Sequence, residues 1–106
     1  MIGLSVRLLK EDQVQKVVDW LAEVDGPRRA EAVRTLIAEG VRHEVASILR
    51  TGAGTFLIYA MESDDLERAQ AVGAASDAEI DRKHHAVMAE AVAARPDVTQ
   101  LLSIAP

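Results

Sequence analysis

Four side chains of this 106-residue sequence could together carry out proton-transfer chemistry. They are the imidazole of His84, the carboxyl of Glu44, the phenol of Tyr59 and the guanidinium of Arg7. A histidine beside a carboxylate in apolar surroundings can titrate near neutral pH and serve as a general base or acid. A phenol or a guanidinium can stabilise negative charge that develops on a substrate oxygen. If the four converge, we expect a small polar pocket between a sheet and its helices.

Helical periodicity favours an inward position for the histidine. A helix is predicted over residues 77–94. On a helical wheel, His84 lies on a stripe that is otherwise apolar and consists of Ile80, Val87 and Ala91. We therefore expect the imidazole to face the sheet. Two interpretations stay open: an active imidazole with a carboxylate partner, or a core histidine bonded to a backbone carbonyl.

The other three candidates each fall within a predicted strand. Charged residues are uncommon in strands with one buried face, so Arg7 and Glu44 stand out. Successive side chains point to opposite sides of a strand, so His43 cannot act together with Glu44. One interpretation places Arg7, Glu44 and Tyr59 opposite His84. The other places Arg7 and Glu44 at the surface or at a subunit interface, where they form an intersubunit ion pair.

The first half of the chain supplies three strands and a broken helix to position these groups. Alternation of apolar and polar residues predicts a strand over 2–9, and an apolar stripe of period 3.6 begins near Glu11. The stripe is interrupted at 25–27, where Asp-Gly-Pro stands, and resumes up to Gly40. Two further strands flank a turn that contains two glycines, and their ranges are 41–50 and 55–61.

The second half repeats the pattern with a second broken helix. One short helical segment follows Ser63, the longer helix of residues 77–94 comes next, and Pro96 ends it. The last apolar run, Val98–Ile104, is predicted to be the final strand. This order is typical of the ferredoxin-like βαββαβ fold, an α+β fold with a four-stranded antiparallel sheet and helices on one face. We predict one domain over residues 1–106.

Such a fold leaves the second face of the sheet bare. A largely apolar open face is a liability in a monomer, and packing against a second copy buries it economically. We therefore predict a homodimer, a dimeric α/β barrel in which two sheets face each other.

Composition excludes several classes of protein. The chain has no cysteine, so disulfides and thiolate metal sites are absent, and its three histidines lack the spacing of a metal site. A net charge of -5 and an aromatic content of 3% disfavour nucleic-acid binding. No apolar run is long enough to cross a membrane and no signal peptide is evident, which predicts a cytoplasmic protein without a membrane partner.

Several segments of the chain resemble a family of small bacterial and archaeal proteins that is classed as a domain of unknown function within the dimeric α/β-barrel superfamily. The resemblance covers nearly the whole chain and is most specific at residues 80–84. The matching segments are Val6-Arg7-Leu8, Asp19-Trp20, Thr35 to Gly40, Glu44, Leu57-Ile58-Tyr59, Ile80-Asp81-Arg82-Lys83-His84 and the closing Leu101 to Pro106.

This resemblance implies a ferredoxin-like subunit, a face-to-face dimer and recurring polar positions at Glu44, Tyr59 and His84. The superfamily includes cofactor-free monooxygenases, muconolactone isomerases and haem-degrading enzymes, and fold alone does not choose among them. The chain departs from the family pattern after His84, where Val87 and Met88 stand instead of an aromatic residue. We expect a pocket that is wider or less aromatic.

Three functional hypotheses follow. The leading one is an enzyme that needs no cofactor and acts on a small organic molecule by isomerisation, cyclisation or oxygenation. In it His84 is the base or acid, Glu44 its partner carboxylate, and Tyr59 or Arg7 the group that stabilises an oxyanion. The second is a non-catalytic dimeric module that binds a ligand or has a structural role. The third is haem binding through His84.

Overall fold

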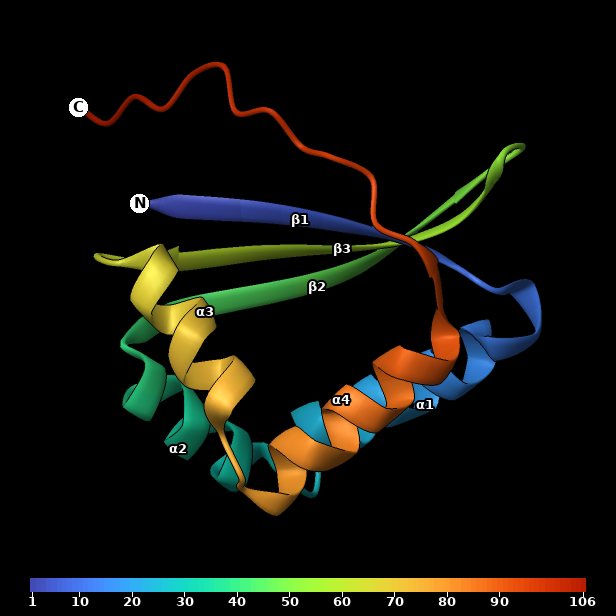
Figure 1. Ribbon diagram of the computed structural model, residues 1–106, viewed down its shortest axis with the longest axis horizontal. Helices are drawn as coiled ribbons and strands as arrows, with labels where there is room; N and C mark the ends of the chain where they lie inside the picture. Colours follow the sequence, from blue (N-terminus) through green and yellow to red (C-terminus); the bar gives the residue numbers. More distant parts are fainter.

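Four helices cover one side of a four-stranded antiparallel sheet whose strand order is β2-β3-β1-β4 (Figure 1). The computed structural model describes all residues from Met1 to Pro106. Its elements are β1 (Ile2–Leu9), the short 3-10 helix η1 (Glu11–Gln13), α1 (Val14–Asp25), α2 (Arg29–Glu39), β2 (Val41–Thr51), β3 (Gly54–Ser63), α3 (Leu66–Ala75), α4 (Glu79–Ala91) and β4 (Val92–Ala94). This order confirms the ferredoxin-like α+β arrangement, with each helical connection split into two helices.

The last strand lies earlier in the chain than the sequence predicts. The prediction for Val98–Ile104 is wrong, because β4 is Val92–Ala94 and nothing after it is regular secondary structure. The helix predicted to reach residue 94 ends at Ala91, where the chain turns to pair with β1. The amide of Lys10 donates to the Ala91 carbonyl at 2.8 Å, so pairing with β1 overrides the helical propensity of the alanines.

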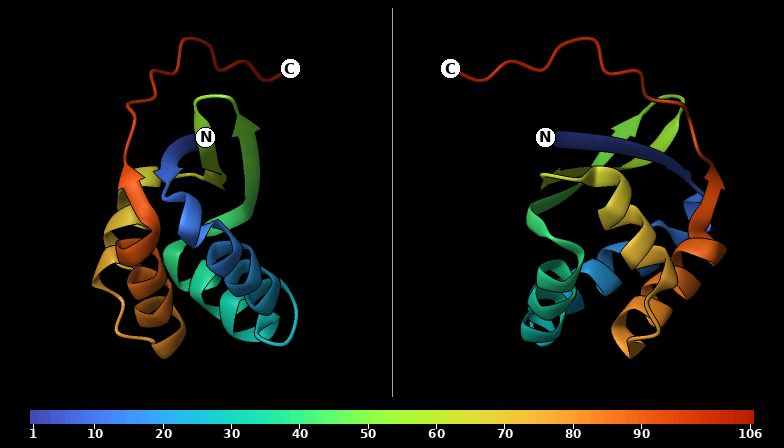
Figure 2. Two further views of the ribbon diagram at one scale, coloured as in Figure 1. Left: turned by 90° about the vertical axis from the view of Figure 1, so that its right-hand side faces the viewer. Right: turned by 60° about the vertical axis from the view of Figure 1, so that its left-hand side comes forward.

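The helices form two pairs on the same face of the sheet. Helix α1 packs beside α4 at one end, and α2 packs beside α3 at the other (Figure 2). The core cluster sits under the first pair and consists of Leu9, Val14, Val17, Leu57 and Ala91. None of the four helices is long and apolar enough to cross a membrane.

Strand register shows which side chains face the helices. Leu57 of β3 is completely buried in the core under α1 and α4, so the odd-numbered residues of β3 point toward the helices. Leu57 pairs with Arg7 of β1 and with Ile48 of β2, which places odd residues of β1 and even residues of β2 on that same face.

The opposite face of the sheet is open and apolar. Leu4, Val45 and Leu49 lie on it and are each exposed by nearly half. The segment 95–106 runs along this side of the sheet, away from the helices (Figures 1 and 2). Only 11 of 106 residues are buried in the single chain, which is a small core for a domain of this length.

Candidate functional site

Three of the candidate residues form a row across the inner face of the sheet. Tyr59 lies opposite Ser5 of β1 and opposite Ala46 of β2. Arg7 and Glu44 are each two positions further along the neighbouring strands, so they flank Tyr59 diagonally. Diagonal neighbours on one face lie within reach of long side chains. All three therefore point to the helices rather than to the open face.

This placement puts both charged strand residues on the helix side of the sheet. An interface made by the open sheet face would not include Arg7 or Glu44, since both lie on the opposite face. His43 pairs with Glu62 on the open side, away from Glu44, as the alternation of side chains requires.

The hydroxyl of Tyr59 is buried and has no hydrogen-bond partner in the protein. Burial raises the pKa of this phenol, the negative charge of Glu44 adds to the rise, and Arg7 opposes it. Tyr59 therefore stays protonated at neutral pH. A buried hydroxyl without a partner costs free energy, so this O–H group is available to donate to a bound molecule.

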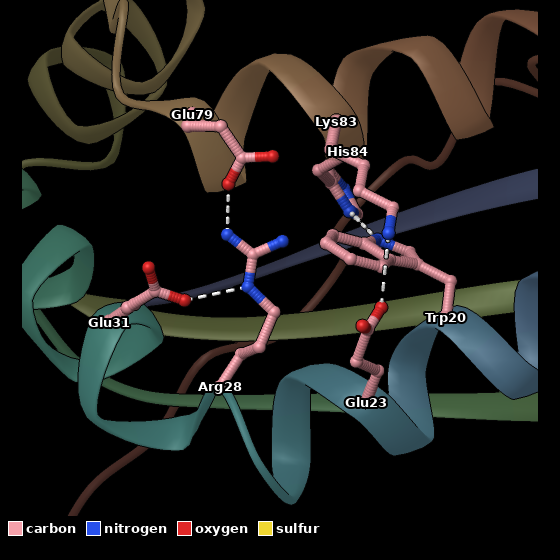
Figure 3. A network of polar contacts seen from close by, with 7 residues as sticks. All are labelled: Trp20, Glu23, Arg28, Glu31, Glu79, Lys83 and His84. Atoms are coloured by element: carbon pink, nitrogen blue, oxygen red, sulfur yellow. Dashed lines mark hydrogen bonds and ion pairs between the residues drawn. The ribbon is translucent and has the colours of Figure 1, made fainter.

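His84 of α4 lies against Tyr59. Their ring centroids are 6.1 Å apart and the ring planes are nearly perpendicular. On the other side, Trp20 of α1 donates its indole N–H to Nδ1 of His84 at 3.0 Å (Figure 3). An indole nitrogen only donates, so Nδ1 is the unprotonated nitrogen and Nε2 carries the hydrogen. Burial lowers the pKa of His84, and the adjacent His85 lowers it further, so the ring is neutral at physiological pH.

Trp20 is itself held by cations from two neighbouring elements. Nζ of Lys83 lies 4.9 Å from the centroid of the indole ring, and the guanidinium carbon of Arg28 lies 5.6 Å from it. Both distances are within the range of cation–π attraction. The indole, with 4% of its surface exposed, therefore has two cations against its ring and its N–H group bonded to His84.

Carboxylates in turn fix these cations. Arg28 forms ion pairs with Glu31 of α2 and Glu79 of α4, and Lys83 bonds Glu23 of α1 at 3.3 Å (Figure 3). Exposed ion pairs contribute little stability singly. Here they connect three helices around one indole, and so they orient it toward the imidazole.

A second group of carboxyls lies beside the row, toward α2 and α4. Burial raises the pKa of Glu44, and the charge of Asp81 raises it further. Glu39, with the same kind of surroundings, has its pKa raised to about 7 by burial and by the charges of Asp81 and Glu44. Glu39 and Asp81 also line a cleft of about 270 Å³ between α2, α3 and the start of α4. Glu44 does not line this cleft, but its charge interacts with those of the two acids that do.

The opposite end of the row is positively charged. Arg7 makes no ion pair, and its only side-chain hydrogen bond runs from Nη1 to the carbonyl of Val6 at 3.0 Å. Arg95 directly follows β4, whose Ala94 pairs with Leu8, so Arg95 comes next to Arg7. Burial lowers the pKa of Arg7, and the positive charge of Arg95 lowers it further.

The structure therefore brings the four predicted residues into one region and adds three that the sequence did not single out for it. These are Trp20, which fixes the imidazole, Glu39, whose pKa is raised by burial and further by the charge of Glu44, and Arg95, which extends the positive end. Trp20 and Glu39 each stand in a segment that resembles the family pattern, whereas Arg95 carried no signal. No group of three histidine, aspartate or glutamate side chains is arranged to hold a metal ion.

Comparison with known proteins gives the family but no activity. The chain belongs to a family of unknown function, DUF6176, whose model matches residues 4–105. No curated protein and no solved structure matches the chain.

Proposed function

We propose that this protein is an enzyme that transfers a proton within a small organic molecule and needs no cofactor for it. The observation that carries the proposal is the row Glu44, Tyr59 and Arg7 under the imidazole of His84, with a buried phenol that has no protein partner. The row supplies a titratable carboxyl, two neutral hydrogen-bond donors and a cation within one side of the sheet. Isomerisation, cyclisation and reaction of a carbanion with oxygen all begin with such a proton transfer.

In this mechanism Glu44 is the base. The lone pair of His84 Nδ1 accepts the hydrogen bond of Trp20, and Nε2 carries the hydrogen, so the neutral ring has no free lone pair to take a proton. The sequence had suggested the reverse assignment, with His84 as base or acid and Glu44 as its partner. A carboxyl whose pKa is raised by burial is a stronger base than an exposed one and can also return the proton.

His84 and Tyr59 then stabilise the oxyanion. Both are neutral donors in a buried place, where hydrogen bonds to developing negative charge are worth more than in water. The neutral imidazole of His84 carries its hydrogen on Nε2 and can donate it in a hydrogen bond without any change of protonation state. The ring contact between His84 and Tyr59 keeps the two donors on the same side of the bound molecule.

We further propose that two chains form the working unit by packing their open sheet faces together. The exposed apolar side chains of that face and of segment 95–106 support this, since Leu101 and Leu102 are 91% and 72% exposed. A matched pair of substitutions tests it. Val45→Lys on the open face should prevent dimerisation in sedimentation equilibrium, whereas Val33→Lys on α2, of similar exposure, should not. Equal effects of the two would contradict the proposal.

The two alternative functions receive less support. A structural module that uses the polar residues to set dimer register would need them on the open face, and they lie on the other one. Haem ligation through His84 Nε2 would need the hydrogen on Nδ1, where it would meet the indole N–H of Trp20.

Hydrogen–deuterium exchange tests the catalytic proposal without knowledge of the substrate. Pools of small carbonyl compounds with acidic C–H bonds are incubated with the protein in D2O, and deuterium incorporation is followed by mass spectrometry. We expect at least one compound to exchange, and Glu44→Gln to abolish the exchange. Glu67→Gln, an exposed carboxyl on α3, serves as the matched control and should retain it. Exchange that is equal in protein and buffer, or that survives Glu44→Gln, would refute the assignment.

A further inference from the structure

The positive end of the row has no negative partner within the chain. Each of three other arginines, Arg28, Arg29 and Arg42, forms an ion pair with a nearby carboxylate. Arg7 is half-buried and forms none, although the chain carries more acidic than basic residues. Arg95, which follows β4, adds a second positive charge beside it. A partly buried cation without a counter-charge is unfavourable, and here a like charge increases the cost.

We propose that the small molecule bound at this site carries a carboxylate, which Arg7 and Arg95 hold at the β1–β4 side of the row. The proposal rests on the site of the proposed function and names the class of molecule that it takes. A guanidinium presents two parallel N–H groups that match the two oxygens of a carboxylate. The phenol of Tyr59 lies next to Arg7, which allows it to donate to the same molecule.

A monovalent carboxylate fits the charges better than a phosphate. Glu44 lies on the other flank of Tyr59, and Asp81 and Glu39 lie beyond it. These carboxyls repel a dianion more strongly than a monoanion. The row therefore has a positive end and a negative end, and a carboxylate can bind at one while a C–H bond faces the carboxyl at the other.

The spacing of the strands limits the length of this molecule. Arg7 and Glu44 stand on strands separated by β3, and they are level with Leu57 and Met61, four residues apart on β3, so their backbones are roughly 17 Å apart. The long side chains of both residues occupy much of that distance. The reacting carbon should therefore lie only a few bonds from the carboxylate.

Binding of a charged probe and its uncharged counterpart tests this inference. Benzoate and benzamide have nearly the same shape and differ in charge, and binding of each to the full chain is measured by calorimetry and by NMR shifts of Tyr59 and His84. We expect benzoate to bind at least about tenfold more tightly than benzamide. Arg7→Gln should remove that preference, Arg7→Lys should retain part of it, and Arg95→Gln should reduce it. Arg82→Gln, an exposed arginine of α4 that makes no ion pair, is the control.

Each result bears on one claim. Equal binding of benzoate and benzamide, or no shift at Tyr59 with millimolar benzoate, would overturn the carboxylate inference. Inorganic phosphate binding more tightly than benzoate would overturn the choice of a monoanion. A preference that persists in folded Arg7→Gln, judged by circular dichroism, would place the anion elsewhere. If the preference depends on Arg7 but no deuterium exchange depends on Glu44, the carboxylate site stands and the catalytic proposal fails.

Discussion

The hydrogen bond from Trp20 to His84 predicts that an indole determines the state of the imidazole. Trp20→Phe removes the N–H donor and keeps an aromatic ring in place. The acceptor at Nδ1 then loses its partner in a largely buried position, which costs about 1–3 kcal/mol. The smaller ring also binds the cations of Arg28 and Lys83 less well, which costs roughly another 0.5 kcal/mol. We expect a loss of about 2 kcal/mol and a fall in Tm of roughly 10 °C.

The same substitution changes the titration of the histidine. The indole N–H stabilises only the neutral ring, because a protonated Nδ1 would place two hydrogens against each other. Without it, the pKa of His84 should rise toward its ordinary value. The preference for hydrogen on Nε2 should weaken as well.

Long-range proton–nitrogen NMR of the histidine rings measures both effects, and urea unfolding measures the stability. Lys83→Met is the matched control, since it removes a cation from the indole face but leaves the N–H donor in place. It should leave the hydrogen on Nε2. If Trp20→Phe also keeps the hydrogen on Nε2 with an unchanged pKa, the indole does not set the state of His84, and the assignment of Glu44 as base loses its reason.

Three further predictions concern the surroundings of the site. The pKa of Glu39 is raised to about 7, so the folded state holds this proton more tightly than the unfolded state does, and that contribution to stability is lost as the pH rises from about 4.5 through 7. Glu39→Gln should therefore stabilise the protein more at pH 8 than at pH 4.5, as measured by urea unfolding. An equal effect at both pH values would contradict the shift. Tyr59→Phe removes a buried hydroxyl without a partner, so we expect the free energy of unfolding to stay level or to rise by up to about 1 kcal/mol, while ligand binding weakens. A clear loss of stability would show that the hydroxyl is bonded within the protein. Leu101→Ser combined with Leu102→Ser should weaken dimerisation at least about tenfold in sedimentation equilibrium, and unchanged association would exclude segment 95–106 from the interface.

Local patterns were sufficient to predict the order of elements but not the last strand. The stripes of α1 and α4 and the hairpin of β2 and β3 follow from periodicity and turn residues that lie close together in sequence. The position of β4 depends on pairing with β1, more than 80 residues earlier in the chain. Residues 92–94 and 98–104 are both apolar, and only that pairing distinguishes them.

Which side of each strand points toward the helices could not be predicted either. Alternation shows that Ser5 and Arg7 share one side of β1, and that Leu4 and Val6 share the other. The usual rule places the apolar side toward the helices, yet here Arg7 faces them and Leu4 is 48% exposed. In the proposed dimer the sheet would be buried on both faces, by helices on one and by a second copy on the other, and the rule would then have no contrast between faces to detect. The contact between Trp20 and His84 depends on the rotation of two helices, 64 residues apart in sequence, and no local pattern specifies it.

The proposed mechanism therefore rests on a single titratable group. Tyr59 has a raised pKa and stays protonated, Arg7 stays charged, and the free lone pair of His84 is already used. Glu44 is left to take a proton and to return it, which it does from one face of the bound molecule because it is fixed on one strand. A one-base site suits a proton shift between neighbouring carbons, where removal and return occur on the same face. It does not suit racemisation, which needs a second acid on the opposite face. In this mechanism the stereochemistry of the product follows from the hydrogen bond of one indole, because that bond leaves Glu44 as the one base among Arg7, Glu44, Tyr59 and His84.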